Sequence, residues 1–322
     1  MDGPALPQER ILHPPPPAPP AEDRPTAGPG RVTPGRLLLH LSLLGATWVT
    51  AVLAGSLFWD DAQEPLGSWE DLAARPWVLL SGWPYALCLL LVLGSHEMGH
   101  YLACRYYGIP ATLPFFLPAP PPFILGTFGA VIRIRGAIPH RRALFDVAAA
   151  GPIAGFAVAL PVLIAGVAWA RPAPDPPPAG GWELGSPLLS AVLERWLHGE
   201  RPIQVNAFLG AGWVGMLVTS LNLFPVGQLD GGHAAYAVSR RLHRTLSRGT
   251  IFGLLALVSY QFHSPTAVPV YFVWLVVSLI LRDRHPRLQD ETLSLGRVRM
   301  LLAVALLLMF IATFIPVPIG HL

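Results

Sequence analysis

Seven apolar runs, each close to the length of a membrane-crossing helix, constrain this chain more than any other feature. A helix needs roughly 20 residues to cross a hydrocarbon core of about 30 Å, and in lipid its backbone must satisfy its own hydrogen bonds. The expected spans cover residues 37–58, 80–104, 143–170, 205–225, 249–263, 266–282 and 299–316. The pattern predicts an all-α polytopic membrane protein whose short fifth and sixth spans are tilted, partly interfacial or a tight helical hairpin around Ser264-Pro265.

Composition agrees with the membrane interpretation. Hydrophobic residues make up 52% of the chain and charged residues 13%, and the mean hydropathy is +0.49. The net charge is only +3, and the arginines stand in short clusters between apolar runs, so they do not form one continuous basic face. This distribution is typical of membrane orientation and argues against nucleic-acid binding. We therefore expect a lipid bilayer, and no nucleic acid, among the partners.

The N-terminal stretch differs from the rest in composition. Residues 1–36 contain eleven prolines, including the run Pro14 to Pro17, and few apolar side chains other than Ala and Leu. Such a segment cannot bury enough apolar surface to fold. We expect a disordered, Pro-rich cytoplasmic tail over residues 1–36 and one integral membrane domain over residues 37–322.

Basic residues occur in every second loop between the expected spans. Arginines precede the first span and follow the second, fourth and sixth, whereas the loop after the first span is acidic and residues 171–204 are mixed in charge. Because cytoplasmic loops are enriched in Lys and Arg, this alternation predicts a cytoplasmic N-terminus and an external C-terminus. The Ala-, Arg- and Pro-rich composition points to the cytoplasmic (inner) membrane of a bacterium.

A metal-binding motif lies at the end of the second span. The segment 94–100 reads GSHEMGH and contains HExxH. On a helix, His96 and His100 lie on one face one turn apart, so both imidazoles can reach one cation. Glu97 can accept the proton of the hydrolytic water, whose pKa a metal lowers toward about 7. Two structural histidines are the plainer alternative, but ionisable groups inside an apolar helix are costly and are functional candidates by default.

A third ligand is expected because catalytic zinc usually has three protein ligands and a water. The best candidate is Asp230, in the segment NLFPVGQLDGGH (222–233) on the same side of the membrane as His100. Pro225 can end a helix, and the glycines after it permit close backbone approach. In the alternative interpretation, Asp230 is an N-cap for a helix over 231–239. His233 is a further possible ligand, although an accessory or solvent-facing role is favoured.

The paired motifs resemble the site-2 protease family of intramembrane metalloproteases. HExxH in one span and NxxPxxxLDGG in a later one match the family pattern, and AGPIAG (150–155) is similar to its glycine-proline element. The segments FFLP (115–118) and GTFGA (126–130) resemble the branch of plastid and bacterial members without a PDZ domain. The resemblance covers about residues 80–316. It implies one zinc ion held by the two histidines and the aspartate, and Asn222 as a residue that holds the substrate backbone or the oxyanion.

The stretch between the second and third spans is not helical in pattern, because prolines interrupt residues 110–136. Residues 130–135 alternate in a way typical of a short strand, so we expect a membrane-associated β-hairpin or strand near residues 112–136. A free strand edge beside the metal could pair with an extended substrate, since a peptide bond inside a helix is poorly exposed to attack. A purely structural hairpin is the alternative.

The function predicted is zinc-dependent cleavage of transmembrane segments of other membrane proteins, with Glu97 as general base. Two other classes stay open. A divalent-metal transporter or metal-binding membrane protein could also carry His and Asp in its spans, although it would not need Glu97 beside the first histidine. A proteolytically inactive relative that only binds membrane segments is the second.

Overall fold

The computed structural model describes residues 33–59, 74–120, 123–174, 182–264, 270–281, 288, 290 and 292–321. Most of the tail expected over residues 1–36 lies outside these residues, as does the acidic loop after the first span. A helix is present in each of the seven expected spans. These helices are α1 (Pro34–Phe58), α3 (Trp83–Tyr106), α4 (Arg141–Ala168), α6 (Ala207–Asn222), α8 (Arg240–His263), α9 (Tyr271–Leu281) and α10 (Arg297–Thr313).

Three segments are long and apolar enough to cross a membrane by themselves. They are α1, the segment Pro76–Tyr106 that ends in α3, and α4, while α6 and α9 are shorter apolar helices. Helix α8 begins at Arg240, well before the expected start of its span at 249, because the Ser239 hydroxyl accepts a hydrogen bond from the Arg241 N–H and caps the basic segment as helix. The described helices support a membrane protein, and length and composition support three of its seven expected crossings.

Three shorter helices were not among the expected spans. They are the 3-10 helix η1 (Pro76–Leu80), which leads into α3, and the α-helices α5 (Leu188–His198) and α7 (Asp230–Val238). The last is the helix considered as the alternative for residues 231–239. Its N-cap is Leu229, and no side chain caps it. The N-cap interpretation of Asp230 is therefore wrong, because Asp230 is already the first helical residue.

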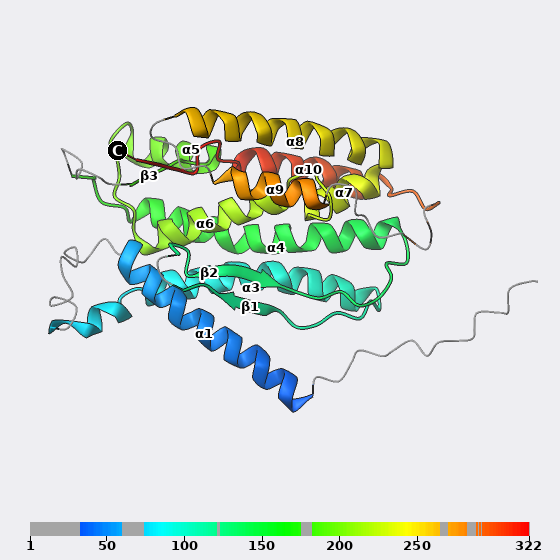
Figure 1. Cartoon of the computed structure of the whole chain (residues 1–322). Helices are drawn as coiled ribbons and strands as arrows, with labels where there is room; N and C mark the ends of the chain where they lie inside the picture. The colour runs from blue at the N-terminus through cyan, green and yellow to red at the C-terminus, as the bar shows by residue number, and fades with distance from the viewer. Residues whose placement is uncertain are drawn as a thin grey trace, which may run out of the picture.

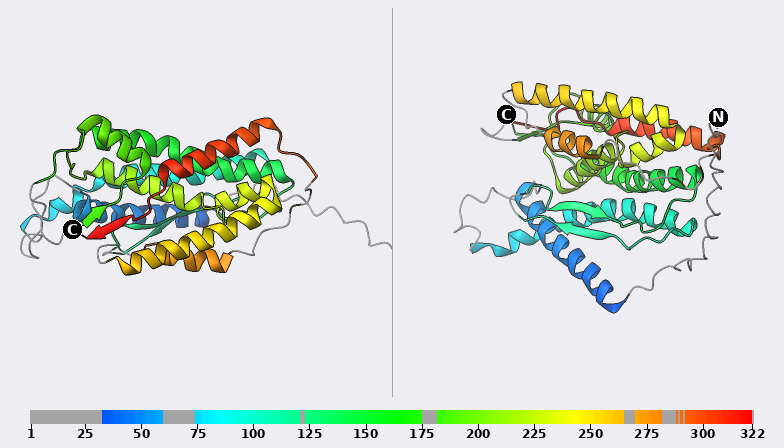
Figure 2. Two further views of the ribbon diagram at one scale, coloured as in Figure 1. Left: turned by 90° about the horizontal axis from the view of Figure 1, so that it is seen from above. Right: turned by 45° about the vertical axis from the view of Figure 1, so that its right-hand side comes forward.

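Helix α4 lies at the centre of the bundle, between α3 on one side and α6 on the other (Figure 1). Its close approach to both neighbours depends on glycine. A Cβ at Gly99 of α3 would lie 2.4 Å from the Ala150 carbonyl oxygen, and one at Gly212 of α6 would lie 2.6 Å from Leu163 Cα. Small residues let membrane helices approach in this way. Helix α1 instead crosses the bundle obliquely, and its N-terminal end points away from α3 (Figures 1 and 2).

A two-stranded antiparallel hairpin lies beside α3, as expected for residues 112–136. It consists of β1 (Phe115–Pro118) and β2 (Thr127–Val131), with Phe115 opposite Val131. The strand expected over 130–135 is shifted, because β2 ends at Val131. Beyond it the chain changes partner, and the Arg133 carbonyl and the Arg135 N–H bond to the backbone of residues 110–112. A second pair, β3 (Trp182–Leu184) with β4 (Ile319–His321), was not expected.

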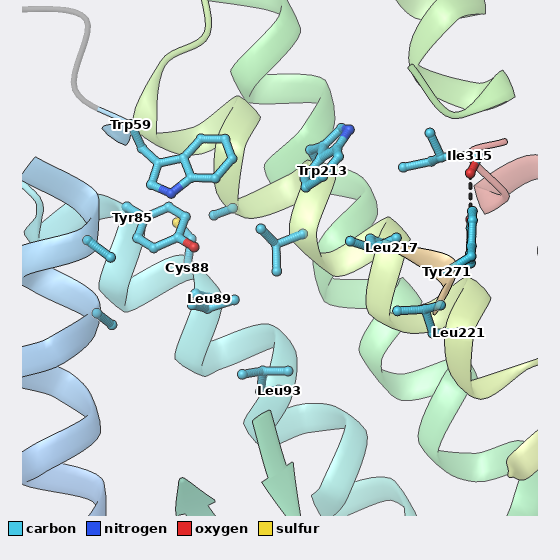
Figure 3. Close-up of a cluster of buried hydrophobic side chains, with 14 of the residues drawn as sticks. Trp59, Tyr85, Cys88, Leu89, Leu93, Trp213, Leu217, Leu221, Tyr271 and Ile315 are labelled. Atoms are coloured by element: carbon cyan, nitrogen blue, oxygen red, sulfur yellow. Dashed lines mark hydrogen bonds between the residues drawn. The ribbon is translucent and has the colours of Figure 1, made fainter. Parts of the chain in front are cut away.

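The main apolar core joins α1, α3, α6 and α9. Trp59 stacks on Tyr85 with ring centroids 5.4 Å apart, and Trp213 lies beside Trp59 in a tilted arrangement with centroids 6.1 Å apart (Figure 3). The Tyr271 hydroxyl donates a hydrogen bond to the Ile315 carbonyl, which fixes α9 to the end of α10. Large apolar side chains cover the outer surface of the bundle, for example Leu38, Phe252 and Leu301, each at least 66% exposed. Contiguous apolar surface of this kind suits contact with lipid.

Candidate metal centre

The two motif histidines lie one turn apart on α3 and point to the same place. The Nε2 atoms of His96 and His100 are 3.1 Å apart, and both side chains are buried, at 4% and 7% exposure. The i and i+4 spacing puts them on one helix face. Two imidazole nitrogens that face each other at this distance in an apolar bundle are arranged so that they could bind one cation together.

Asp230 completes the group from a segment more than a hundred residues later in the chain. Its Oδ2 atom lies 3.3 Å from His96 Nε2 and 3.3 Å from His100 Nε2. Burial raises the pKa of the Asp230 carboxyl, but the two histidines outweigh that effect and hold it below its ordinary value. Among the described residues, His96, His100 and Asp230 are the one group of three or more His, Cys, Asp or Glu that could hold a metal, with ligand atoms within 4.8 Å of one another.

The donor set fits zinc. Bonds of about 2.0–2.1 Å in a tetrahedral site place neighbouring ligand atoms about 3.3 Å apart, which agrees with the three separations found here. The other nitrogen of His100, Nδ1, lies 2.7 Å from the Val147 carbonyl oxygen of α4. That acceptor requires a proton on Nδ1, so the lone pair of Nε2 faces the cation position. Outer partners of this kind commonly orient metal-binding histidines.

The glycine-proline element of α4 forms the wall behind the histidines. A Cβ at Gly151 would lie 2.1 Å from His100 Nε2, and one at Gly155 would lie 3.0 Å from His96 Cβ. Only glycine leaves room for the His100 ring at the first of these positions. Pro152, beside Gly151, stands inside the helix without ending it. The sequence motif 150–155 therefore has a direct steric role at the candidate metal centre.

Glu97 lies next to the first histidine and is connected to the hairpin. Its side chain is largely buried, at 9% exposure, and it accepts a hydrogen bond from the backbone N–H of Ile132. Sequence reasoning missed this partner because a backbone group leaves no signature in the side-chain pattern. The contact orients the carboxylate of the candidate general base and ties it to the residues that follow β2.

Asn222 is the last residue of α6, and its side chain reaches the same centre. Its amide nitrogen lies 3.3 Å from His96 Nε2. The structure thus brings together all five side chains expected at the site, and these are His96, Glu97, His100, Asn222 and Asp230. His233, one turn after Asp230 on α7, is not part of the group of possible metal ligands.

A second polar cluster joins three helices close to the metal centre. The guanidinium of Arg299 on α10 binds Asp146 of α4 through two hydrogen bonds, Nε to Oδ1 at 2.8 Å and Nη2 to Oδ2 at 2.7 Å. The Tyr107 hydroxyl, at the end of α3, donates to the same carboxylate. Asp146 directly precedes Val147, whose carbonyl accepts from His100. This clamp, defined as Tyr107, Asp146 and Arg299, fixes the start of α4 where it supports the histidine.

These features define a class: a helical membrane protein that can hold one divalent cation among buried His and Asp side chains, with a carboxylate base beside them. Comparison with protein families identifies the family within this class. Residues 84–263 match the model described as peptidase family M50, and the chain belongs to that family. The resemblance to site-2 proteases is thereby confirmed, as is the assignment to the metalloprotease class.

Curated relatives of this chain are named as probable zinc metalloproteases. The probable chloroplastic zinc metalloprotease EGY2 of Arabidopsis thaliana is 32% identical over 217 residues, which is 64% of this chain and 36% of that protein. EGY2 of Oryza sativa subsp. indica is 31% identical over 72% of this chain and 42% of its own length. EGY1 of Oryza sativa subsp. japonica is 29% identical over 73% of this chain and 41% of its length. Zinc, as expected, is the metal named for these proteins, and this chain spans about two fifths of their length.

Proposed function

We propose that this protein is an intramembrane zinc endopeptidase that cleaves transmembrane segments of other membrane proteins. The observation that carries the proposal is the convergence of His96, His100 and Asp230 within 4.8 Å. Glu97 stands beside His96 on α3, where the reaction requires a general base. One zinc ion per chain is proposed, with these three side chains as ligands and Glu97 and Asn222 as catalytic residues.

The protein's own groups have distinct tasks in this mechanism. Zinc, when bound, supplies a Lewis acid that lowers the pKa of water toward about 7 and polarises the peptide carbonyl. Glu97, oriented by the Ile132 N–H, accepts the proton of the attacking water and then delivers a proton to the leaving amine. The amide of Asn222, 3.3 Å from His96 Nε2, donates a hydrogen bond to the carbonyl oxygen as negative charge develops on it.

Seven membrane crossings are proposed, with the N-terminus in the cytoplasm and the C-terminus outside, in the cytoplasmic membrane of a bacterium. The described arginines near helix ends support the orientation. The end of α3 and the starts of α4, α8 and α10 lie at the right-hand end of the bundle in Figure 1. These helix ends carry Arg105, Arg141, Arg142, Arg240, Arg241, Arg297 and Arg299. Basic residues favour the cytoplasmic face.

The decisive experiment compares the purified wild-type chain with Glu97→Gln, both reconstituted with tagged single-span membrane proteins. Loss of the general base should lower the cleavage rate by about 10²- to 10⁴-fold, while bound zinc, measured by mass spectrometry, stays at the wild-type level. Equal cleavage by the two proteins would refute the mechanism. Zinc flux into sealed vesicles, unchanged by Glu97→Gln, would instead support the transporter alternative.

The backbone that follows β2 is proposed to receive the substrate as an added strand. The N–H and carbonyl of Arg133 bond to Thr112, so strand alternation directs the backbone groups of Ile132 and Ile134 to the opposite edge. That edge faces the metal centre, because the Ile132 N–H reaches Glu97. An extended substrate paired there would present its peptide bond beside the general base.

Proline at position 134 tests the added strand. Ile134→Pro removes one N–H from this edge and leaves the Ile132 to Glu97 contact in place, so cleavage should be lost while zinc content is unchanged. Ile134→Val is the matched control and should cleave at the wild-type rate. Undiminished cleavage by the proline variant would contradict the strand hypothesis without affecting the proposed metal site.

A further inference from the structure

A basic cavity lies between α4, α7 and α10, away from the metal centre. It has a volume of about 760 Å³ and is lined by residues at the start of α4, the end of α7 and the segment 294–304. The segment before α10 is fastened to α4 by the Arg142 Nε, which donates to the Ser294 carbonyl at 2.8 Å. The cavity is therefore built from three elements that are tied together, at the basic end of the bundle.

Two arginines of the cavity have no acidic partner among the residues that the structure describes. Among the described residues, no carboxylate pairs with Arg141 or Arg297 and no acidic side chain lines the cavity. The Nε atom of Arg141 is buried and makes no hydrogen bond within the part of the chain that the structure describes. A buried donor without an acceptor costs about 1–3 kcal/mol, so such a group calls for a ligand. Arg299, two residues after Arg297, differs because Asp146 binds it.

The N-terminus of α10 adds to the positive character of the cavity. Its N-cap is Gly296, no side chain accepts from its first N–H groups, and no acidic residue stands in its first turn. Cations at a helix N-terminus oppose the helix dipole, so Arg297 there is unfavourable unless an anion balances it. Both the charges and the free N–H groups favour an anionic group with several acceptor oxygens.

The rest of the cavity wall is apolar and continues along the membrane-facing side of α10. Val238, Met300, Leu301 and Val304 line the cavity, and the last three are 46%, 71% and 54% exposed. A free phosphate would leave this wall uncovered. A ligand with an anionic head and a hydrocarbon chain matches both parts, because basic cavities between membrane helices on the cytoplasmic side suit lipid headgroups.

We propose that this cavity binds one anionic phospholipid, with its phosphate between Arg141 and Arg297 and an acyl chain along Met300, Leu301 and Val304. The lipid would join the start of α4 to α10 from the bilayer side, on the same helices that the Arg299 to Asp146 pair joins. This binding does not depend on peptide cleavage and can be measured without a protease substrate.

The test uses the full chain in nanodiscs of phosphatidylcholine with or without phosphatidylglycerol, and the double variant Arg141→Gln/Arg297→Gln. Lipid that stays with the protein through detergent extraction is identified by mass spectrometry. The wild type should retain phosphatidylglycerol, and the double variant should bind it about 30-fold more weakly, which is about 2 kcal/mol for two cations. Arg241→Gln/Arg244→Gln removes the same charge from α8, outside the cavity, and should bind like the wild type.

A charge-preserving variant and a competing anion show which part of the lipid the cavity recognises. Arg141→Lys/Arg297→Lys should retain most of the binding, and normal zinc content in every variant shows that the fold persists. Inorganic phosphate should not displace the lipid at equal concentration, because it lacks the acyl chain. Equal retention of phosphatidylglycerol by the two Gln double variants would overturn the proposal, as would phosphate that competes as well as lipid does.

Discussion

Helices α4 and α1 are packed in opposite ways, although both are apolar and of similar length. In their most apolar windows 44% of α4 is buried but only 22% of α1. The contacts of α4 are with α3, α5, α6, α7 and α10, whereas those of α1 are with α3, η1 and the hairpin. The proposed metal ligands thus lie in the tightly packed part of the bundle. The α1 side of the bundle is the more loosely packed one.

The largest effect is expected from filling the space behind His100. In Gly151→Ala the new methyl would occupy the position of the His100 ring, so the ring must move away from its partners. Overpacking of this kind costs about 1–3 kcal/mol, and here the displaced side chain is a proposed ligand. Bound zinc and cleavage should both be lost.

Gly253→Ala serves as the control for that variant. Gly253 lies inside α8, and a Cβ there meets nothing within 4 Å. Zinc content, measured by mass spectrometry on both proteins, should be normal in the control. Full zinc occupancy in Gly151→Ala would show that the core around α4 is less rigid than its packing indicates.

A smaller effect is expected where α1 meets the hairpin. Gly126 has φ +69°, and a Cβ there would lie 2.6 Å from Ala51 Cα and from the Thr50 carbonyl oxygen. Gly126→Ala should push α1 off the hairpin and lower the unfolding temperature, followed by tryptophan fluorescence, while zinc is retained. Gly108 has a similar φ of +67°, but a Cβ there meets nothing within 4 Å. Gly108→Ala therefore measures the effect of backbone strain alone, without the steric clash that Gly126→Ala adds. Loss of zinc in Gly126→Ala would contradict the separation between the two parts.

The clamp at the start of α4 should contribute less, because its ion pair is partly exposed. Arg299→Gln removes two charged hydrogen bonds to Asp146, for which we expect about 1–2 kcal/mol of lost stability. Zinc affinity should weaken as well, since Asp146 precedes the residue that holds His100. The neighbouring Arg297→Gln, without an acidic partner among the described residues, should leave the unfolding temperature in detergent unchanged, and a drop equal to that of Arg299→Gln would count against the clamp.

The smallest effect concerns one hydrogen bond at the periphery. The Thr50 hydroxyl donates to the Gly126 carbonyl at 2.6 Å, between α1 and the hairpin. Thr50→Val should cost about 1 kcal/mol, visible as a modest fall in unfolding temperature, with no change in zinc content. Thr50→Ser keeps the hydroxyl and should behave like the wild type.

The sequence predicts the helices and the main site residues, but it does not predict the long-range contacts that position them. Apolar runs mark spans, and the spacing of His96 and His100 identifies one helix face, so these follow from local patterns. The position of Asp230 followed from placing two loops on one side of the membrane. In contrast, the β3 and β4 pair and the Arg299 to Asp146 bond join residues more than 130 positions apart, and a single sequence gives no sign of such partners.

Contacts made by backbone groups could not be predicted from the sequence either. The Val147 carbonyl that fixes His100 and the Ile132 N–H that orients Glu97 belong to residues whose side chains are ordinary aliphatic ones. Helix α8 extends beyond the expected span for a related reason, since the apolar run marks only its later part and Ser239 caps a basic turn before it.

The hydrogen bond from the Ile132 N–H to Glu97 links the segment after β2 directly to the proposed general base. If a substrate strand pairs with the backbone of residues 132–134, as proposed, it binds to the same segment that orients the Glu97 carboxylate. We therefore expect the rate at which the proposed base works to respond to changes in this segment as well as to changes at Glu97 itself. The proposed metal ligands lie on α3 and α7, outside this segment.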